Sequence, residues 1–193
     1  MKYTEDFFVL YDYSHIFDKS TLLVGDDYVG TGAIIRLIGK IDKPISGEII
    51  IDDNNILEIK NKELNLAIIP NNPIFINNNL FDNLYYPLKI RKINKKIAKN
   101  IIDNAIFHYK IDNFNKKINK LNISEKKIIS LLRAKIRQPK YILIDNLFDN
   151  FDIKYLDIIE KILIDISKES IIIATEKIAN TTYEKLNFEI VNL

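Results

Sequence analysis

The chain has 193 residues, and its hydrophobic fraction of 47% is sufficient to bury a sizeable core, which excludes a disordered protein. Its 28 basic and 26 acidic residues leave a net charge of +2, which is too balanced to argue for nucleic acid, and we expect no nucleic-acid partner. The absence of cysteine excludes disulfides, thiolate metal sites and cysteine catalysis. The only histidines, His15 and His108, lie far apart, so we expect no metal site.

No stretch contains the ~18 consecutive apolar residues of a membrane span. The first six residues include Glu5 and Asp6 and lack the apolar core of a secretory signal. We therefore expect a protein of a cytosol-like compartment.

Apolar runs bounded by turn residues alternate along the chain with segments of helical period. Strands are predicted at 7–10, 21–24, 47–52, 66–69, 141–145, 171–175 and 188–191. Helices are predicted at 32–38, 125–137 and 153–167. Continuous apolar strands that alternate with amphipathic helices predict an α/β fold, with a mainly parallel sheet covered by helices. Ile49–Ile51, Ile142–Ile144 and Ile171–Ile173 are expected to build this central sheet.

The segment from about 80 to 122 is rich in Lys, Asn and Ile and is helical in period. Ile93, Ile97, Ile101, Ala105 and His108 follow one another at steps of three or four residues and are predicted to form one largely apolar helix face, with lysines on the other face. We predict one domain over 1–193, with a core at 1–79 and 123–193 and a helical lobe at about 80–122.

A glycine-containing loop joins the strand at 21–24 to the next helix. Gly25 and Gly30 keep the spacing of a phosphate-binding P-loop, but Thr31 takes the position of the lysine and Gly32 that of the magnesium-binding hydroxyl. The lost charge-assisted hydrogen bond is worth about 1.5–3 kcal/mol, and neither Thr31 nor Ala33 can replace it. Two acids, at positions 26 and 27, add negative charge there. The alternative interpretation is an ordinary strand–helix turn.

From about Tyr3 to Thr175, the order of these features resembles the ATP-binding cassette (ABC) ATPase family. The stretches that carry the resemblance are 46–49, 67–71, 82–91, 132–140, 141–145 and 149–152, of which 82–91 is similar to importer-type subunits. The resemblance implies an ABC-type P-loop ATPase-like fold with an N-terminal antiparallel β part and an inserted helical lobe. It also implies a vestigial nucleotide site. Its residues are Gly25, Gly30, Thr31, Gly32, Ala33, Asp145 and Tyr3.

Two members of this set have alternative interpretations. Asp145 either holds magnesium or is a strand-end acid that makes a cap. Tyr3 either stacks on adenine or is a partly buried strand tyrosine. We expect no cofactor, with weak ATP or ADP binding as the alternative.

The sequence departs from the family at the positions that carry its chemistry. The resemblance places Asn146 at the catalytic glutamate, Asn71 at the Q-loop glutamine and Glu176 at the switch histidine, while Asp152 matches the final acid of the D-loop. The signature motif aligns at 121–125 or 123–127, and both registers contain Ser124 but no glycine. An amide cannot accept the proton of the attacking water, and loss of a general base costs about 10²–10⁴-fold. We therefore expect no catalytic residue.

The leading interpretation is a pseudo-ATPase subunit that docks on a membrane-spanning permease-like subunit or on a second ABC ATPase-like chain, as a homo- or heterodimer. Its expected location is cytoplasmic and peripheral to a membrane, or facing the matrix or stroma of an organelle. The candidate partner contacts are Phe75, Phe81, Tyr85 and Tyr86, with core packing as the alternative.

Two other functions stay open: a divergent ABC ATPase that binds and slowly hydrolyses ATP, and a structural subunit of a non-transport assembly. Few residues follow Thr175, so we expect this chain to lack the regulatory C-terminal extension of many importer-type subunits.

Overall fold

A computed structural model describes residues 2–4, 7–8, 12–25, 30–61, 63–111, 114 and 116–193. Its central sheet has the order β6-β7-β8-β3-β9, and every neighbouring pair is parallel. The strands are β3 (Thr21–Val24), β6 (Leu66–Ile69), β7 (Tyr141–Asp145), β8 (Ile171–Glu176) and β9 (Glu189–Asn192). The predicted parallel α/β sheet is therefore confirmed.

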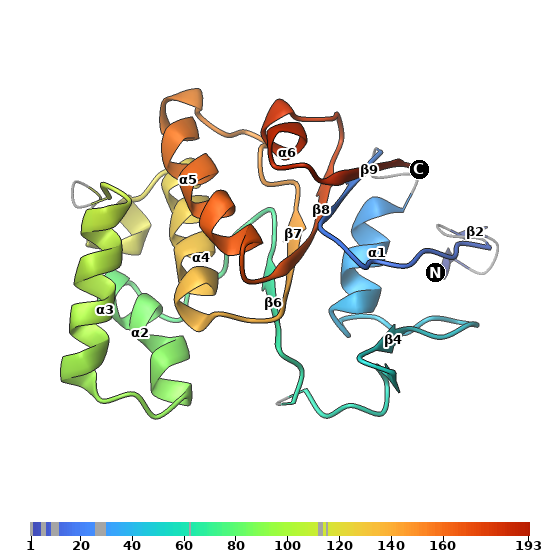
Figure 1. The fold of residues 1–193 in the computed structure, drawn as a ribbon, viewed down its shortest axis with the longest axis horizontal. Coiled ribbons are helices and arrows are strands. Elements are labelled where there is room, and N and C mark those ends of the chain that lie inside the picture. The colour runs from blue at the N-terminus through green and yellow to red at the C-terminus, as the bar shows by residue number, and fades with distance from the viewer. Residues whose placement is uncertain are drawn as a thin grey trace.

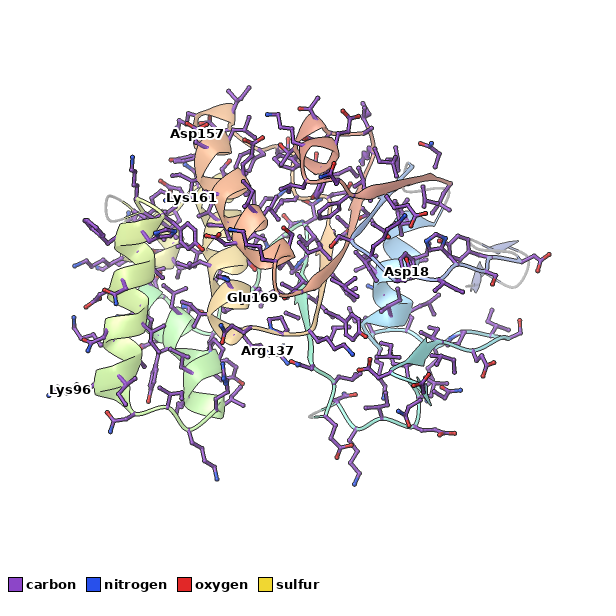
Figure 2. The ribbon with its side chains drawn as sticks, viewed as in Figure 1. Asp18, Lys96, Arg137, Asp157, Lys161 and Glu169 are labelled. Carbon is purple, nitrogen blue, oxygen red and sulfur yellow. The ribbon has the colours of Figure 1, made fainter. Side chains whose placement is uncertain are left out.

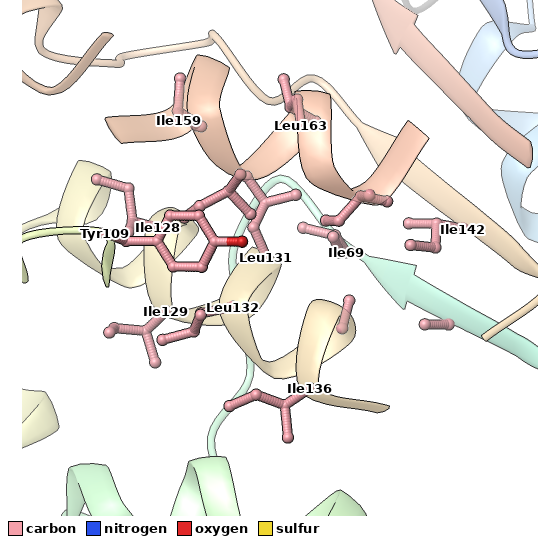
Figure 3. Packing of buried hydrophobic residues seen from close by; sticks show 14 of the residues in the cluster. Ile69, Tyr109, Ile128, Ile129, Leu131, Leu132, Ile136, Ile142, Ile159 and Leu163 are labelled. Carbon is pink, nitrogen blue, oxygen red and sulfur yellow. The ribbon is translucent and has the colours of Figure 1, made fainter. Parts of the chain in front are cut away.

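Alternation along the strands divides the core into two layers. Leu23, Leu143 and Ile173 face α1 (Thr31–Ile38), whereas their neighbours in the chain, among them Leu22 and Ile142, face the opposite layer. That layer contains α4 (Ile123–Arg137) and α5 (Leu156–Ser167), whose apolar faces meet the sheet in Figure 3. Because both faces are covered, these strands are apolar almost throughout.

Two short antiparallel pairs lie outside this sheet. β1 (Lys2–Thr4) pairs with β2 (Phe7–Phe8), and β4 (Ile50–Ile51) pairs with β5 (Asn54–Asn55). The prediction that Ile49–Ile51 joins the central sheet is therefore wrong. Asp52 and Asp53 both have positive φ, at 51° and 62°, so the chain turns back on itself at once and forms a separate hairpin.

Helices α2 (Leu80–Ile90) and α3 (Lys95–His108) and the 3₁₀ helix η1 (Ile118–Lys120) occupy the 80–122 segment. In Figure 1, α3 is the outermost helix of the molecule, on the side away from β4. The division between a core and a helical lobe stays a prediction, and we use "helical lobe" below for residues 80–122. Among the described residues, none of the helices combines the length and apolarity needed to cross a bilayer.

The apolar stripe expected on α3 is not its buried face. Ala98 and Ile102 are fully buried, whereas Ile97 and Ile101 are exposed. These pairs lie one position apart on the helix, and isoleucine occurs on both faces. The sequence pattern of isoleucines therefore does not distinguish the buried face of α3 from its exposed face.

The structure also places the remaining short elements. The 3₁₀ helix η2 (Ile153–Tyr155) precedes α5, and α6 (Thr181–Lys185) connects β8 to β9. Four helices begin at an asparagine whose side chain accepts a backbone N–H of the first turn. These caps are Asn79, Asn94, Asn122 and Asn180. Each such cap stabilises a helix by about 1 kcal/mol, which gives the asparagine-rich composition a structural use.

Candidate functional site at the carboxyl edge of the sheet

The carboxyl ends of four parallel strands meet at one edge. Val24 pairs with Glu176, Thr175 with Asp145, and Ile144 with Ile69. The backbone N–H of Gly25 donates to the carbonyl of Glu176 at 3.1 Å. The segments that follow β3, β6, β7 and β8 therefore leave the sheet together, where open α/β sheets bind ligands.

Part of the glycine loop lies at this edge. Gly30 has φ +92° and caps α1, and Thr31 and Ala33 are buried in the first turn of that helix. Gly32 has no atom within 4 Å of the place a Cβ would occupy. Asp26 and Asp27, which are predicted to add negative charge to this loop, belong to the segment 26–29, outside the described residues. In the described part of the loop, therefore, the amide groups at the helix N-terminus have no lysine beside them.

Tyr3 lies in β1, whose backbone pairs with β2. Its side chain is outside the described part of the structure, so the adenine-stacking role stays a prediction.

Asp145 ends β7 with its carboxylate already engaged. Its Oδ1 accepts the Thr175 hydroxyl at 3.1 Å and the Asn146 side-chain amide at 3.3 Å. Asn146 adopts the left-handed region with φ +47° and is buried. The Oδ1 of Asn146 has no hydrogen-bond partner among the described residues. The edge thus has a carboxylate held by neutral donors beside an unpaired amide oxygen.

A buried lysine on α4 connects this edge to two neighbouring loops. Lys127 is 1% exposed, and its Nζ donates to Asn71 Oδ1 at 2.9 Å, to the carbonyl of Asn146 at 2.9 Å and to the carbonyl of Asp149 at 2.6 Å. An ammonium group has three donors, and all three are used. Asn71 also donates to Asp149 Oδ2 at 3.0 Å, which closes the network.

The Lys127 side chain is subject to opposing electrostatic influences. Burial lowers its pKa, whereas the carboxylates of Asp149, Glu176 and Asp145 raise it. No sequence motif marks Lys127 as a functional residue. The available signal was its place on the buried face of α4, four residues before Leu131, because an unpaired lysine is almost never buried.

Glu176 is a second buried charge at the edge. Its Oε1 accepts the backbone N–H of Phe148 at 3.1 Å and the hydroxyl of the fully buried Tyr183 at 3.3 Å. Burial raises the pKa of Glu176 to about 7, while these hydrogen bonds and the charge of Lys127 oppose the rise. Glu176 and Lys127 therefore influence each other's ionisation.

The signature and D-loop positions contact each other within this chain. The Ser124 hydroxyl accepts the backbone N–H of Asp152 at 2.8 Å, and the carboxylate of Asp152 accepts the N–H of Lys154 at 3.1 Å. Asn122 and Glu125 form a reciprocal capping box at the start of α4. Of the two possible positions of the signature motif, 121–125 spans the start of α4, whereas 123–127 lies within α4.

Three of the four predicted contact aromatics, Phe75, Phe81 and Tyr85, are partly buried and pack against the main core, and their role as partner contacts stays a prediction. Tyr86 is 47% exposed. It lines a groove of about 1060 Å³ between β6, α2 and the carboxyl half of α4, together with Phe75. The exposed isoleucines of the groove are Ile74, Ile76 and Ile90.

The parallel sheet, the glycine loop after β3 and the acid that ends β7 define an ATPase-type α/β domain. The sequence model of the ABC transporter family matches residues 18–149. The chain therefore belongs to the ABC transporter family, as an ATP-binding-type domain.

Two import ATP-binding proteins are similar to this chain. The spermidine/putrescine import ATP-binding protein PotA of Mycoplasma mycoides subsp. mycoides is 33% identical over 134 residues, which are 68% of this chain and 38% of that protein. The molybdate/tungstate import ATP-binding protein WtpC of Methanocaldococcus jannaschii is 30% identical over 69% of this chain and 46% of its own length. The chain thus spans less than half of these relatives.

A solved structure shares the fold. A bacterial Atm1-family ABC exporter with ATP bound superposes with a TM-score of 0.80 and 18% identity, over 100% of this chain and 35% of that one. This likeness confirms the expected ABC-type fold.

We predict that Lys127→Met lowers the free energy of unfolding by about 3 kcal/mol, because it leaves buried acceptors unpaired among carboxylates. Urea unfolding measures this loss as a lower midpoint at unchanged slope. The control is Lys126→Met, the same substitution one residue earlier, with an expected change within about 0.5 kcal/mol. Equal effects of the two substitutions would show that the network does not stabilise the fold.

We predict that Glu176→Gln stabilises the protein increasingly as the pH rises above 4.5, with most of the gain reached by pH 7. The folded pKa of about 7 lies above the ordinary 4.5, so the folded state holds the proton more tightly and its stability falls as pH rises from 4.5 to 7. Glutamine resembles the protonated form. Its advantage should reach roughly 3 kcal/mol at pH 8 and vanish below pH 4.5.

Unfolding titrations at pH 4, 6 and 8 measure the effect of Glu176→Gln. Glu184→Gln removes the same charge from the exposed side of α6 and is expected to change the stability by less than about 0.5 kcal/mol. A Glu176→Gln advantage that is the same at pH 4 and pH 8 contradicts the assignment of a buried carboxyl with a raised pKa.

Proposed function

We propose that this chain is a subunit of an ABC transporter-type complex that hydrolyses little or no ATP and acts by docking on a membrane partner. The observation that carries the proposal is the Lys127 network. The ammonium group is buried among Asp145, Asp149 and Glu176 and hydrogen-bonds the segments after β6 and β7. In a working ATPase this edge would need a bound cation to balance its negative charge. Here the ammonium group of Lys127 provides the positive charge.

Two substitutions at the same edge support the loss of hydrolysis. Thr31 provides no charge for a terminal phosphate, and Asn146 cannot take a proton from water. One oxygen of the Asp145 carboxylate, Oδ1, already accepts hydrogen bonds from Thr175 and Asn146, which compete with a metal ion for that oxygen. Each of these differences weakens the binding or hydrolysis of ATP. Together they remove the cation that would hold the phosphates and the base that would activate the water.

A second candidate is a divergent ATPase that binds and slowly hydrolyses nucleotide. Two features favour it: the unpaired Oδ1 of Asn146, and the N-terminus of α1 behind Gly30, where no side-chain cap occupies the first amide groups that the structure describes. A buried acceptor of this kind gains from a hydrogen-bond donor such as an ordered water.

The groove beside Tyr86 supports docking. Ile74 is 74% exposed at its rim, and Ile76 and Ile90 are exposed next to it. Arg133 forms part of the wall, with its guanidinium over the Phe75 ring at 5.5 Å and donating to the carbonyl of Ile74 at 3.0 Å. A groove with an apolar rim fits the apolar face of a short helix from a membrane subunit.

The relatives named above are import ATP-binding proteins, and the proposed location of this chain is accordingly the cytoplasmic face of a membrane, held there by its partner. A second ABC ATPase-like chain is the other proposed partner. Weak ATP or ADP binding without turnover agrees with this function.

We predict that the wild-type chain releases no phosphate from Mg-ATP above background and binds it with a Kd weaker than about 1 mM. Restoring the charge with Thr31→Lys should tighten binding roughly tenfold or more, since a charge-assisted hydrogen bond is worth about 1.5–3 kcal/mol. Calorimetry and a phosphate-release assay give these values. The control is Thr181→Lys on the exposed surface of α6, which should leave binding unchanged. Micromolar binding with turnover by the wild type sinks the proposal.

We predict that the chain co-purifies from detergent-solubilised membranes with a multi-span membrane protein, and that Ile74→Asp with Tyr86→Asp lowers the recovery at least tenfold. Two charges in an apolar contact cost several kcal/mol of binding. The control pair is Ile153→Asp with Ile178→Asp, two isoleucines as exposed as Ile74 but outside the groove. Loss with the control pair alone would place the contact elsewhere and contradict docking through the groove.

A further inference from the structure

Charge is distributed unevenly between the two parts of the chain. The helical lobe has ten basic residues and three acidic ones, a net charge of +7, so the rest of the chain carries −5. The nearly neutral total conceals this separation. The basic residues are Lys89, Arg91, Lys92, Lys95, Lys96, Lys99, Lys110, Lys116, Lys117 and Lys120. Such asymmetry creates a dipole that orients the molecule toward an anionic surface.

Large apolar side chains are exposed in the same part of the molecule. On α3, Phe107 is 81% exposed and Ile97 is 57% exposed. Lys96 and Phe107 are eleven residues apart, which is three helical turns, so they share one face of α3. Figure 2 shows Lys96 pointing away from the body of the molecule. We call Lys96, Ile97, Ile101 and Phe107 the outer face of the lobe, which also includes Asp103, two turns after Lys96. Lys95 is exposed beside this face, at the N-terminal end of α3.

A hollow of about 960 Å³ adjoins the outer face, and Ile101 and Phe107 belong to both. The apolar lining of the hollow also includes Leu88 from α2 and Ile136 from α4. The charged lining residues are Arg91, Lys110 and Lys135, of which Lys135 is ion-paired with Glu169 at 3.1 Å. No carboxylate lines this hollow within the described part of the chain. An apolar floor with a cationic rim suits a ligand that is apolar at one end and anionic at the other.

From these features we propose that the outer face and the adjoining hollow bind the surface of an anionic lipid bilayer. The helix α3 lies flat on the membrane, with Phe107 and Ile97 in the headgroup region and Lys95 and Lys96 paired with lipid phosphates. The remainder of the chain, with its opposite charge, faces away. This inference goes beyond the proposed function, because it concerns a different surface and requires no membrane-protein partner.

The chemistry of the basic residues favours lipid over an acidic protein. Nine of the ten are lysines, which act as mobile point charges, whereas arginine is the residue suited to fixed bidentate contacts with carboxylates. Lys99 forms a salt bridge with Asp103, but Lys95 and Lys96 have none within the described residues. Their ammonium groups are therefore available to headgroups, which have no fixed geometry.

Co-sedimentation of the purified full chain with vesicles tests the proposal. We expect binding to vesicles of 70% phosphatidylcholine and 30% phosphatidylglycerol, and at least tenfold weaker partition onto phosphatidylcholine alone. Each lysine near an anionic surface is worth about fivefold, so Lys95→Glu with Lys96→Glu should lower the partition coefficient roughly 25-fold or more. Phe107→Ala should lower it roughly tenfold, because it removes an inserted ring.

Matched controls separate this surface from general charge and apolarity. Lys43→Glu with Lys60→Glu makes the same charge change on exposed sites outside the lobe, and Ile178→Ala shortens an exposed isoleucine elsewhere. Neither should change the partition coefficient more than twofold. Equal binding to both vesicle types, or equal losses in test and control variants, overturns the proposal. Retention on immobilised polyglutamate without vesicle binding overturns it in favour of an acidic protein. Because the groove residues are intact in these variants, the result is independent of docking to a permease.

Discussion

The ammonium group of Lys127 is the constraint on which the edge of the sheet depends. A buried cation is tolerated only when each of its donors has an acceptor and opposite charges lie near. Here the acceptors belong to two segments, one with Asn71 after β6 and one with Asn146 and Asp149 after β7. The loops after β6 and β7 are therefore held in one arrangement by α4, and each is stable only while the others are in place.

This constraint connects the chemistry of the edge with its rigidity. The side chains of Asp145, Thr175 and Asn146 hydrogen-bond to one another, and Glu176 is held by Phe148 and Tyr183. Polar groups satisfied in this way cost little to bury. The same engagement leaves few of them free for a phosphate or a metal ion. Such an edge, in which Asn146 Oδ1 is the one buried atom of these side chains without a hydrogen-bond partner among the described residues, suits the proposed docking subunit, because its fold would not require a nucleotide.

The two surfaces proposed for partners are neighbours. The groove beside Tyr86 and the hollow beside Phe107 both include Arg91 and Gln138 in their lining. A chain held by a membrane subunit in the groove would have its basic lobe close to that subunit's bilayer. Protein contact would supply specificity, and lipid contact would supply orientation, since the lobe and the rest of the chain carry opposite net charge.

The sequence by itself determined the parallel strands, the glycine loop without its lysine and the amide at Asn146, because apolar period and residue identity are local properties. Only the tertiary structure decided that Lys127 is buried, that Ile97 is exposed while Ala98 is packed, and that Ile50–Ile51 forms a separate hairpin. The reason is physical. The Lys127 network joins residues up to 78 positions apart, and such contacts depend on how the strands and helices assemble rather than on any local pattern.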